Sequence, residues 1–277
     1  MAVDLCGRSV EQPDIAIHEI RKNTKRIRAV YSLFKEATGK ESYHRGRDHI
    51  ATISRLLASH RLSKVYCDCL SEILLDKRNP VDPMVIGKLM HQLETDHQLR
   101  TNEIVENGSL FNETIILLTR ERDRVEKVSL SEFDFTMLAN GIKNSYADGR
   151  NKLEIALNQN TNENLHELRK TVKSLWNQLI LIRPVWSSMI GLNIHYLDVL
   201  AEKLGKDHDL FELVHYLSIQ GKSTGWTIPW ELTEHIDIKR TNLQKSIVPL
   251  AVRLYSEKPG AFRNRLLSYY KIYKKDY

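Results

Sequence analysis

The sequence predicts an all-α protein, and three observations carry this prediction. Apolar residues recur at helical spacing almost throughout the chain, and no segment shows the sustained apolar–polar alternation of a half-buried strand. The 277 residues include only 12 glycines and 7 prolines. Their combined share, about 7% of the chain, is well below the roughly 12% that these two residues reach in average proteins. A fold of many short strands joined by Gly/Pro turns is therefore not expected. With 42% hydrophobic and 27% charged residues, the composition is that of a globular chain.

Five helices are expected in the first half of the chain, at residues 14–37, 43–60, 63–76, 83–106 and 110–127. In the first of them Ile17, Ile20 and Ile27 recur on one helix face. Asp14 is expected to be its N-cap, and Gly39 is expected to end it. The proline-containing tract 79–83 and the Asn-Gly-Ser run at 107–109 separate the later helices.

Six helices are expected in the second half, at residues 131–159, 162–183, 187–204, 207–220, 229–257 and 260–274. The polar tract 159–162 separates the first two. Pro184 ends the second, because the residue before a proline is disfavoured in the helical conformation. Pro249 is expected to kink the helix at 229–257, since a proline removes one backbone hydrogen bond.

No catalytic or membrane signature is present in the sequence. It contains no P-loop, GxSxG or HExxH motif and no stretch of 18 uncharged apolar residues. Its three cysteines, Cys6, Cys67 and Cys69, lack the CxxC spacing of a zinc site. We therefore expect a soluble cytoplasmic protein that is not an enzyme and has no cofactor, no metal and no membrane contact. The triplet 207–209 (Asp-His-Asp) is expected to cap and pack a helix start, because adjacent helical residues point in different directions.

An internal repeat organises the chain. The run His-Glu-Ile-Arg-Lys-Asn-Thr-Lys at residues 18–25 recurs as His-Glu-Leu-Arg-Lys-Thr-Val-Lys at residues 166–173, and helix-length patterns follow each copy. On a helix, the His, the Arg and both Lys of one copy fall within an arc of about 100°, nearly opposite the apolar stripe. Each copy thus predicts a helix that packs one face and presents a cationic face.

Such a face suits an oligoanion. Like charges three and four residues apart destabilise a helix by a few tenths of a kcal/mol per pair, so an anion is expected to compensate. The Arg fork, the mobile Lys charge and the His donor together fit phosphate. Two other interpretations stay open: a solvated basic face, and a histidine buried in a structural role. A metal is not expected here, because each helix supplies a single His among cations that repel a metal ion. The overall net charge of +6 alone would give no more than solubility.

The chain resembles the CHAD domain, the conserved histidine α-helical domain. The resemblance is carried by the two His-Glu-x-Arg-Lys-x-x-Lys helices, the segment 143–186, the run Leu-Gly-Lys-Asp-His-Asp-Leu at 204–210, and the Lys-Pro that precedes a basic terminal helix. It covers residues 14–275, after an N-terminal tail at 1–13. In the run 57–62, Leu-Ala-Ser-His-Arg-Leu, the family's Arg is kept and Leu62 stands where the family has Asp.

The resemblance implies two four-helix bundles, residues 14–130 and 131–275, related by a pseudo-twofold axis. Their paired basic helices would face a central channel that binds inorganic polyphosphate. It further implies an adaptor or granule-targeting protein without catalytic activity, whose protein partners belong to polyphosphate granules. The residues expected to bind polyphosphate are His18, Arg21, Lys22, Lys25, Arg28, Arg45, Arg47, Lys143, Tyr146, Arg150, His166, Arg169, Lys170, Lys173, Arg265, Lys271 and Lys275.

Two alternative functions come from other classes. The same basic faces could serve the phosphates of RNA or DNA, or the protein could act in triphosphate or polyphosphate turnover. Single-stranded nucleic acid sites normally interleave aromatic platforms with their charges. Here Trp176 and Trp186 fall toward the apolar side of their segment, so nucleic acid is not the expected partner.

Overall fold

The structure, a computed structural model, describes residues 12–35, 40–107, 109–127, 133–224 and 227–276. In these residues all regular structure is helical, which confirms the all-α prediction. The elements are α2 (Pro13–Leu33), α4 (Lys40–Leu56), α5 (Ala58–Leu74), α6 (Pro83–Asn107), α7 (Ser109–Val125), α8 (Phe135–Asn158), α9 (Asn162–Ile182), the 3₁₀ turn η1 (Arg183–Val185), α10 (Ser187–Thr224), α11 (Trp230–Leu254) and α12 (Pro259–Asp276). None of these helices is long and apolar enough to cross a membrane.

The starts of α8 and α9 are capped by side chains, and one expected cap is corrected. The Asp134 carboxylate accepts the Met137 amide at 3.0 Å to cap α8, and the Thr161 hydroxyl accepts the Asn164 amide at 3.2 Å to cap α9. Asp14 is not the N-cap of α2. That position is Gln12, Pro13 is the first helical residue, and Asp14 lies in the first turn. The expected stop at Gly39 lies outside the described residues.

Two helix limits differ from the prediction because tertiary packing overrides local signals. The break between α4 and α5 falls at Leu57, which is fully buried, and not at 61–62. α10 is one helix where two were expected, and it runs straight through residues 205–206. Its apolar residues Leu204 and Leu213 are buried in two different cores, so one continuous helix contributes to both cores. α11 continues past Pro249 to Leu254, in agreement with the expected helix at 229–257, and the kink at Pro249 stays a prediction.

The internal repeat extends to whole helices. An offset of 148 residues, the separation of His18 and His166, maps the limits of α2 onto α9, α6 onto α11, and α7 onto α12 to within three residues. The same offset maps α4 and α5 together onto the long α10. Positions corresponding to α8 fall at or before residue 10, outside the described part of the chain. The arrangement as two four-helix bundles stays a prediction.

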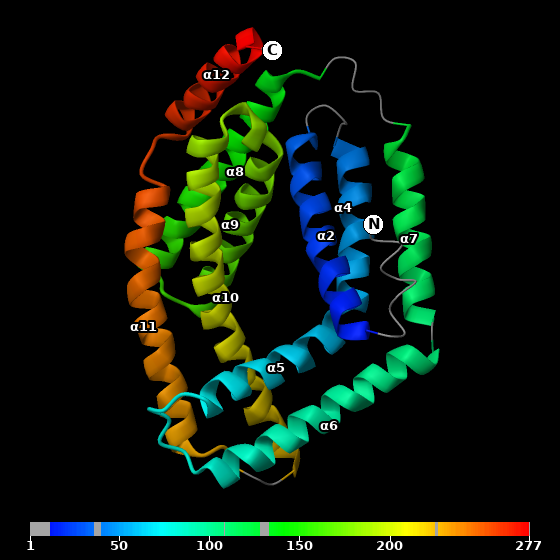
Figure 1. Cartoon of the computed structure of the whole chain (residues 1–277), viewed down its shortest axis with the longest axis vertical. Coiled ribbons are helices and arrows are strands. Elements are labelled where there is room, and N and C mark those ends of the chain that lie inside the picture. The colour runs from blue at the N-terminus through cyan, green and yellow to red at the C-terminus, as the bar shows by residue number, and fades with distance from the viewer. Residues whose placement is uncertain (1–11, 36–39, 108, 128–132, 225–226, 277) are drawn as a thin grey trace.

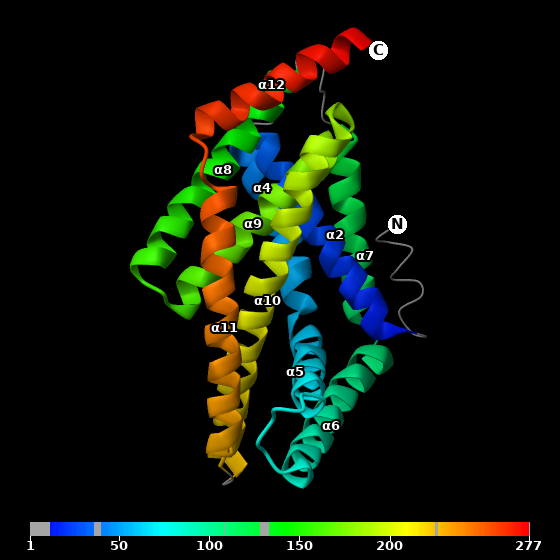
Figure 2. The ribbon, with the colours of Figure 1, turned by 60° about the vertical axis from the view of Figure 1, so that its left-hand side comes forward.

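Three apolar cores hold the helices together. One joins α8, α9, the first part of α10, and residues of α11 and α12; it includes Leu168, Leu200 and Phe262. A second joins α2, α4 and α7. The third packs α5 and α6 against the second part of α10 and the start of α11, at the lower end of Figure 1. In both views α10 runs from the upper half of the molecule to this lower end (Figure 2). It therefore links the repeat helix α9 to the α5–α6 pair.

Candidate anion-binding site

The two repeat helices, α2 and α9, pack against each other, and Figure 1 places both in the upper half of the molecule. Gln178 on α9 is fully buried, and its amide donates to the carbonyl of Ala29 at 3.3 Å and to the hydroxyl of Ser32 at 2.6 Å, both on α2. A buried amide with these partners fixes the register of the two helices. The repeated motifs are thereby held next to each other.

Five cations from three helices form what we call the basic cluster: Arg21 and Lys25 of α2, Arg61 of α5, and Arg169 and Lys173 of α9. Lys25 interacts electrostatically with all four of the others. Arg21 is repelled in turn by Arg61 and Arg169. The repeat helices therefore bring their charges together, and α5 adds one that the repeat itself does not contain.

Lys25 reports the character of this cluster. Its side chain is exposed to solvent, but protein atoms surround much of the ammonium group. The resulting loss of hydration, together with repulsion from Arg169 and Arg21, lowers the pKa of Lys25 to about 8. Within the described part of the chain, Lys25, Arg61 and Arg169 form neither a hydrogen bond nor an ion pair. The Nε of Arg169 is buried and has no acceptor there. Three cations are thus held close together without a neutralising carboxylate in contact.

The other lysines of the repeat are paired with carboxylates, two of them within their own helix. The Glu of each motif pairs with the Lys three residues later, Glu19 with Lys22 at 2.7 Å and Glu167 with Lys170 at 2.5 Å. Lys173 lies 3.3 Å from Asp198 of α10. The repeated face is therefore less uniformly cationic than its Arg and Lys content suggested, and the unpaired charge is concentrated on Lys25 and the arginines.

The two motif histidines act as neutral groups at pH 7. Burial, with help from neighbouring cations, lowers the pKa of both His18 and His166. The His166 ring lies against the His208 ring of α10, with centroids 4.2 Å apart. Burial also lowers the pKa of His208, to about 4. The histidines can therefore offer hydrogen bonds to an anion but contribute no charge until the pH falls.

The run at 204–210 packs against the basic cluster and does not start a helix. A Cβ on Gly205 would stand 3.2 Å from the Arg169 Nη2, so the glycine lets the guanidinium lie directly on α10. Asp207 is buried in mid-helix, 3.2 Å from Arg240 and 2.9 Å from Gln244, which corrects its expected capping role. Burial raises the pKa of Asp209, against the opposing effect of Arg169, Arg61 and Lys25.

Three of the expected binding residues make structural contacts between helices. Tyr146 is buried, its hydroxyl donates to the Leu254 carbonyl at 3.0 Å, and its ring stacks on Phe262 at 4.2 Å. Arg150 donates to the carbonyl of Glu257, and Arg265 pairs with the carboxylate of the same residue at 2.9 Å. These contacts fasten α8 to the α11–α12 junction. Their part in anion binding stays a prediction.

The remaining expected residues lie outside the basic cluster. Arg45 pairs with Glu41 at 2.7 Å and Arg47 with Asp48 at 3.2 Å, each within α4. Lys271 and Lys275 are exposed on α12, which lies at the opposite end of the molecule from α5 (Figure 1). Four of the expected cations form no hydrogen bond or ion pair with any described residue, and none is recorded in electrostatic contact with the cluster: Arg28, Lys143, Lys271 and Lys275.

A polar cavity of about 190 Å³ lies between α8 and α9, next to the motif residues Glu167 and Lys170. Asp148 and Lys152 complete its charged lining. Two cations and two carboxylates balance, so this cavity has no preference for an anion over a neutral ligand. The basic cluster, by contrast, combines unpaired positive charge with solvent access.

Comparison with known proteins agrees with the residue pattern. A family model described as the CHAD domain matches residues 8–218, about three quarters of the chain. The chain belongs to the CHAD family. Searches of curated proteins and of solved structures gave no match. The family match ends within α10, so α11 and α12 of this CHAD protein lie beyond it. They correspond by the 148-residue offset to α6 and α7 of the first half.

Proposed function

We propose that this CHAD protein binds inorganic polyphosphate along the basic cluster, as an accessory protein without catalytic activity of its own. The observation that carries the proposal is the set of three unpaired cations, Lys25, Arg61 and Arg169, held together against their mutual repulsion. Asp209 of α10 acts electrostatically on all three, but it forms no ion pair with them and burial raises its pKa, so a net positive charge remains for an anion to neutralise.

The chemistry of the cluster fits a linear phosphate polymer. Polyphosphate carries about one charge per phosphate and no bases, so ion pairs and charge-assisted hydrogen bonds are sufficient for its recognition. Arg169 and Arg61 supply forked donors, Lys25 a mobile charge, and His18 and His166 neutral donors. The proposal includes a channel between the two halves of the chain, in which the polymer would pass along the basic cluster.

Aromatic residues support this choice over nucleic acid. Trp176 does lie next to the basic cluster, but the Lys173 ammonium covers its ring at 4.3 Å and the remainder of the side chain packs on the core. It is therefore not free to stack on a base. Trp186 is 46% exposed, contrary to the expected apolar position, but it packs edge-on against Tyr269 of α12 and not beside the cluster.

The test is a titration with size-fractionated polyphosphate at several salt concentrations. We expect affinity to rise with chain length until the cluster is spanned, and log K to fall linearly with log salt by roughly 0.7–0.9 per phosphate neutralised. RNA at equal phosphate concentration should not displace the polymer. Equal displacement by RNA would favour a nucleic-acid-binding protein, and release of phosphate on incubation with Mg²⁺ would favour an enzyme.

The proposed cellular role is that of an adaptor in the cytoplasm at polyphosphate granules. A binding module that does not hydrolyse its ligand can stay attached to the polymer and present the rest of its surface to granule proteins. Co-sedimentation with purified granules tests this role: the wild-type protein should sediment with them, and a variant that has lost the charges of Lys25 and Arg169 should remain in the supernatant.

A further inference from the structure

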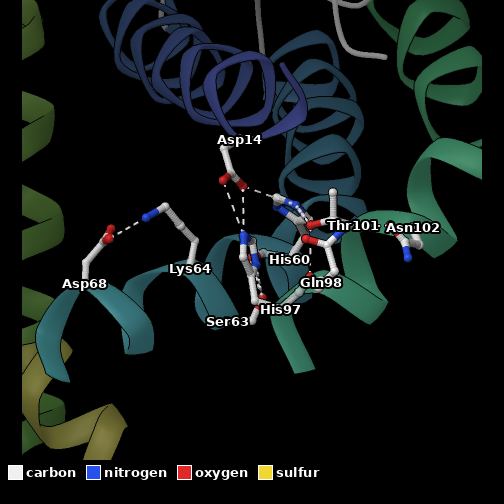
Figure 3. Close-up of polar contacts among 9 residues, drawn as sticks. All are labelled: Asp14, His60, Ser63, Lys64, Asp68, His97, Gln98, Thr101 and Asn102. Carbon is white, nitrogen blue, oxygen red and sulfur yellow. Dashed lines mark hydrogen bonds and ion pairs between the residues drawn. The ribbon is translucent and has the colours of Figure 1, made fainter. Parts of the chain in front are cut away.

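A second cluster of ligand-type side chains lies where α2 begins, against α5 and α6 (Figure 3). Asp14 of α2, His60 of α5 and His97 of α6 each direct one donor atom to a common point, and these atoms lie within 4.8 Å of one another. The Asp14 Oδ1 is 3.3 Å from the His60 Nε2 and 3.2 Å from the His97 Nε2. None of the three belongs to the basic cluster.

These separations match the geometry of a tetrahedral metal site. Zinc binds imidazole nitrogen and carboxylate oxygen at about 2.0–2.1 Å, so two ligands of a regular tetrahedron stand roughly 3.3 Å apart. The two measured donor separations at Asp14 agree with that edge length. Two imidazoles and one carboxylate are also a donor set that divalent transition metals prefer.

The hydrogen bonds around His97 fix which of its nitrogens faces the carboxylate. The Ser63 hydroxyl donates to the His60 carbonyl at 2.8 Å, and its oxygen lies 2.9 Å from the His97 Nδ1. The His97 Nε2 lies 3.3 Å from the Asp14 Oδ2 and shares a hydrogen bond with it in the metal-free protein. When the His97 Nδ1–H donates to Ser63, the Nε2 lone pair is available, and a metal bound there would replace that hydrogen bond. Ser63 thus orients the ring as an outer-shell partner orients a metal ligand.

The carboxylate and the other imidazole are also prepared for a cation. The Asp14 Oδ1 is buried and has no hydrogen bond from any described residue, although two imidazole nitrogens stand beside it. The His60 ring is buried, and its Nε2 lies 3.3 Å from the Asp14 Oδ1. The Thr101 hydroxyl contacts the His97 carbonyl at 2.9 Å and the His60 Nε2 at 3.0 Å. With the Thr101 proton on that carbonyl, the His60 Nε2–H donates to the Thr101 oxygen in the metal-free protein. To bind a metal through Nε2, the ring would carry its proton on Nδ1, which has no partner among the described residues.

Nearby cations oppose a metal ion only weakly. Arg61 and Arg100 both act on His60, and Lys64 acts on Asp14. Arg100 is paired with Asp96 at 2.9 Å and Lys64 with Asp68 at 2.5 Å, so two of the three charges are already compensated. The Asp14 side chain is 38% exposed, which gives an ion a route to the site and leaves room for a water as fourth ligand.

We infer that Asp14, His60 and His97 form a site for Zn²⁺ or a chemically similar divalent metal, which fastens the start of α2 to α5 and α6. The inference does not depend on polyphosphate binding. A metal at this point would connect the helices that carry Lys25 and Arg61, and it would therefore stabilise the spacing of the basic cluster.

The test uses the full chain, freed of metal by dialysis against a chelator and kept free of polyphosphate. Titration with ZnCl₂ should give one bound ion per chain and raise the unfolding temperature. Co²⁺ in its place should develop the strong visible absorption of a tetrahedral N/O site. Asp14→Asn and His97→Gln should each abolish this absorption, while Ser63→Ala should weaken zinc binding by roughly 10–100-fold.

His91→Gln is the matched control, because His91 is exposed on the same helix, α6, and its side chain has no described hydrogen bond. It should bind zinc like the wild type. Absence of saturable zinc binding by the wild type, or equal loss in His91→Gln and His97→Gln, would overturn the site. If His97→Gln proves unfolded by circular dichroism, Asp14→Asn decides the question, since it alters a partly exposed residue in a first helical turn. Retained zinc affinity in that folded variant contradicts the inference.

Discussion

Removal of the Lys25 charge is expected to stabilise the free protein while weakening its binding of polyphosphate. The pKa of Lys25 is about 8 in the folded chain, against 10.5 for an unperturbed lysine. Because the folded state binds the proton less tightly than the unfolded state, the charged side chain destabilises the fold at every pH below about 8. The cost is relieved as the pH rises from about 8 to 10.5. Lys25→Met keeps the aliphatic stem and removes this cost.

The size of the effect follows from the pKa. A lowering from 10.5 to about 8 corresponds to at most about 3 kcal/mol, at 1.36 kcal/mol per pKa unit. Lys25 is open to solvent, which screens much of this repulsion, so we expect a gain of about 1 kcal/mol. For a chain of this size, that is a rise of roughly 2–4 °C in the unfolding temperature.

Thermal unfolding followed by circular dichroism measures this gain. It should be largest at pH 7 and low salt, shrink at high salt because the charges are screened, and decrease steadily above pH 8 until it is lost above pH 10.5, where Lys25 is neutral in both states. Lys271→Met is the control, because Lys271 is exposed on α12 without a described partner; it should leave the unfolding temperature unchanged. A Lys25→Met protein that is no more stable than the wild type at pH 7 would refute the claim of an unrelieved cationic cluster.

Three further outcomes follow from the described contacts. Tyr146→Phe should lower stability by about 1 kcal/mol, because it removes the hydrogen bond to Leu254, and should leave polyphosphate affinity unchanged in the same titration. The affinity of the wild type should fall above pH 8 by at most tenfold per pH unit, since the bound polyanion raises the pKa of Lys25 and one proton is taken up; Lys25→Met should lose this dependence. Glu19→Gln combined with Glu167→Gln should free two lysines, raise polyphosphate affinity and steepen the salt dependence of log K by roughly one to two; unchanged binding would mean that those lysines do not reach the ligand.

Most helices could be predicted from the sequence because helix periodicity and capping are local properties. Thr161 and the polar tract before it marked the start of α9 correctly. The continuity of α10 could not be predicted, because the local signal of Gly205 resembles a break. The contact that favours that glycine comes from 36 residues earlier in the chain, at Arg169, whose Nη2 would stand only 3.2 Å from a Cβ at this position.

The candidate site was predictable in part. The repeat was enough to predict Arg21, Lys25 and Arg169, because the spacing of its residues determines which of them share one helix face. The i, i+3 spacing of Glu19 and Lys22 was enough to predict their ion pair. The prediction considered only the basic residues of the face and therefore treated Lys22 as an unpaired charge. Arg61 lies in a run whose resemblance to the family was visible, yet its approach to the repeat helices depends on how α5 crosses α2.

The structural role of Tyr146 and the zinc-type cluster could not be inferred from local sequence. The sequence pattern around a helical tyrosine is the same whether its side chain faces a ligand or the core. For Tyr146, the packing of α12 against its ring places the side chain in the core. Asp14, His60 and His97 come from three helices, so no spacing motif joins them. Their proximity is a product of the tertiary fold.

Two double variants that remove the same charge, one from the basic cluster and one from α12, provide the most direct test of the cationic cluster. Lys25→Met with Arg169→Met takes two unpaired charges from it, whereas Lys271→Met with Lys275→Met takes two from α12. Arg21 is left intact because its guanidinium donates to the Ser54 carbonyl at 2.5 Å and holds the end of α4. At moderate salt, the first variant should bind long-chain polyphosphate more than tenfold more weakly, since charge-assisted bonds are each worth about 1.5–3 kcal/mol, while the second keeps most of its affinity. Equal losses in both variants, or no loss in the first, would contradict the account.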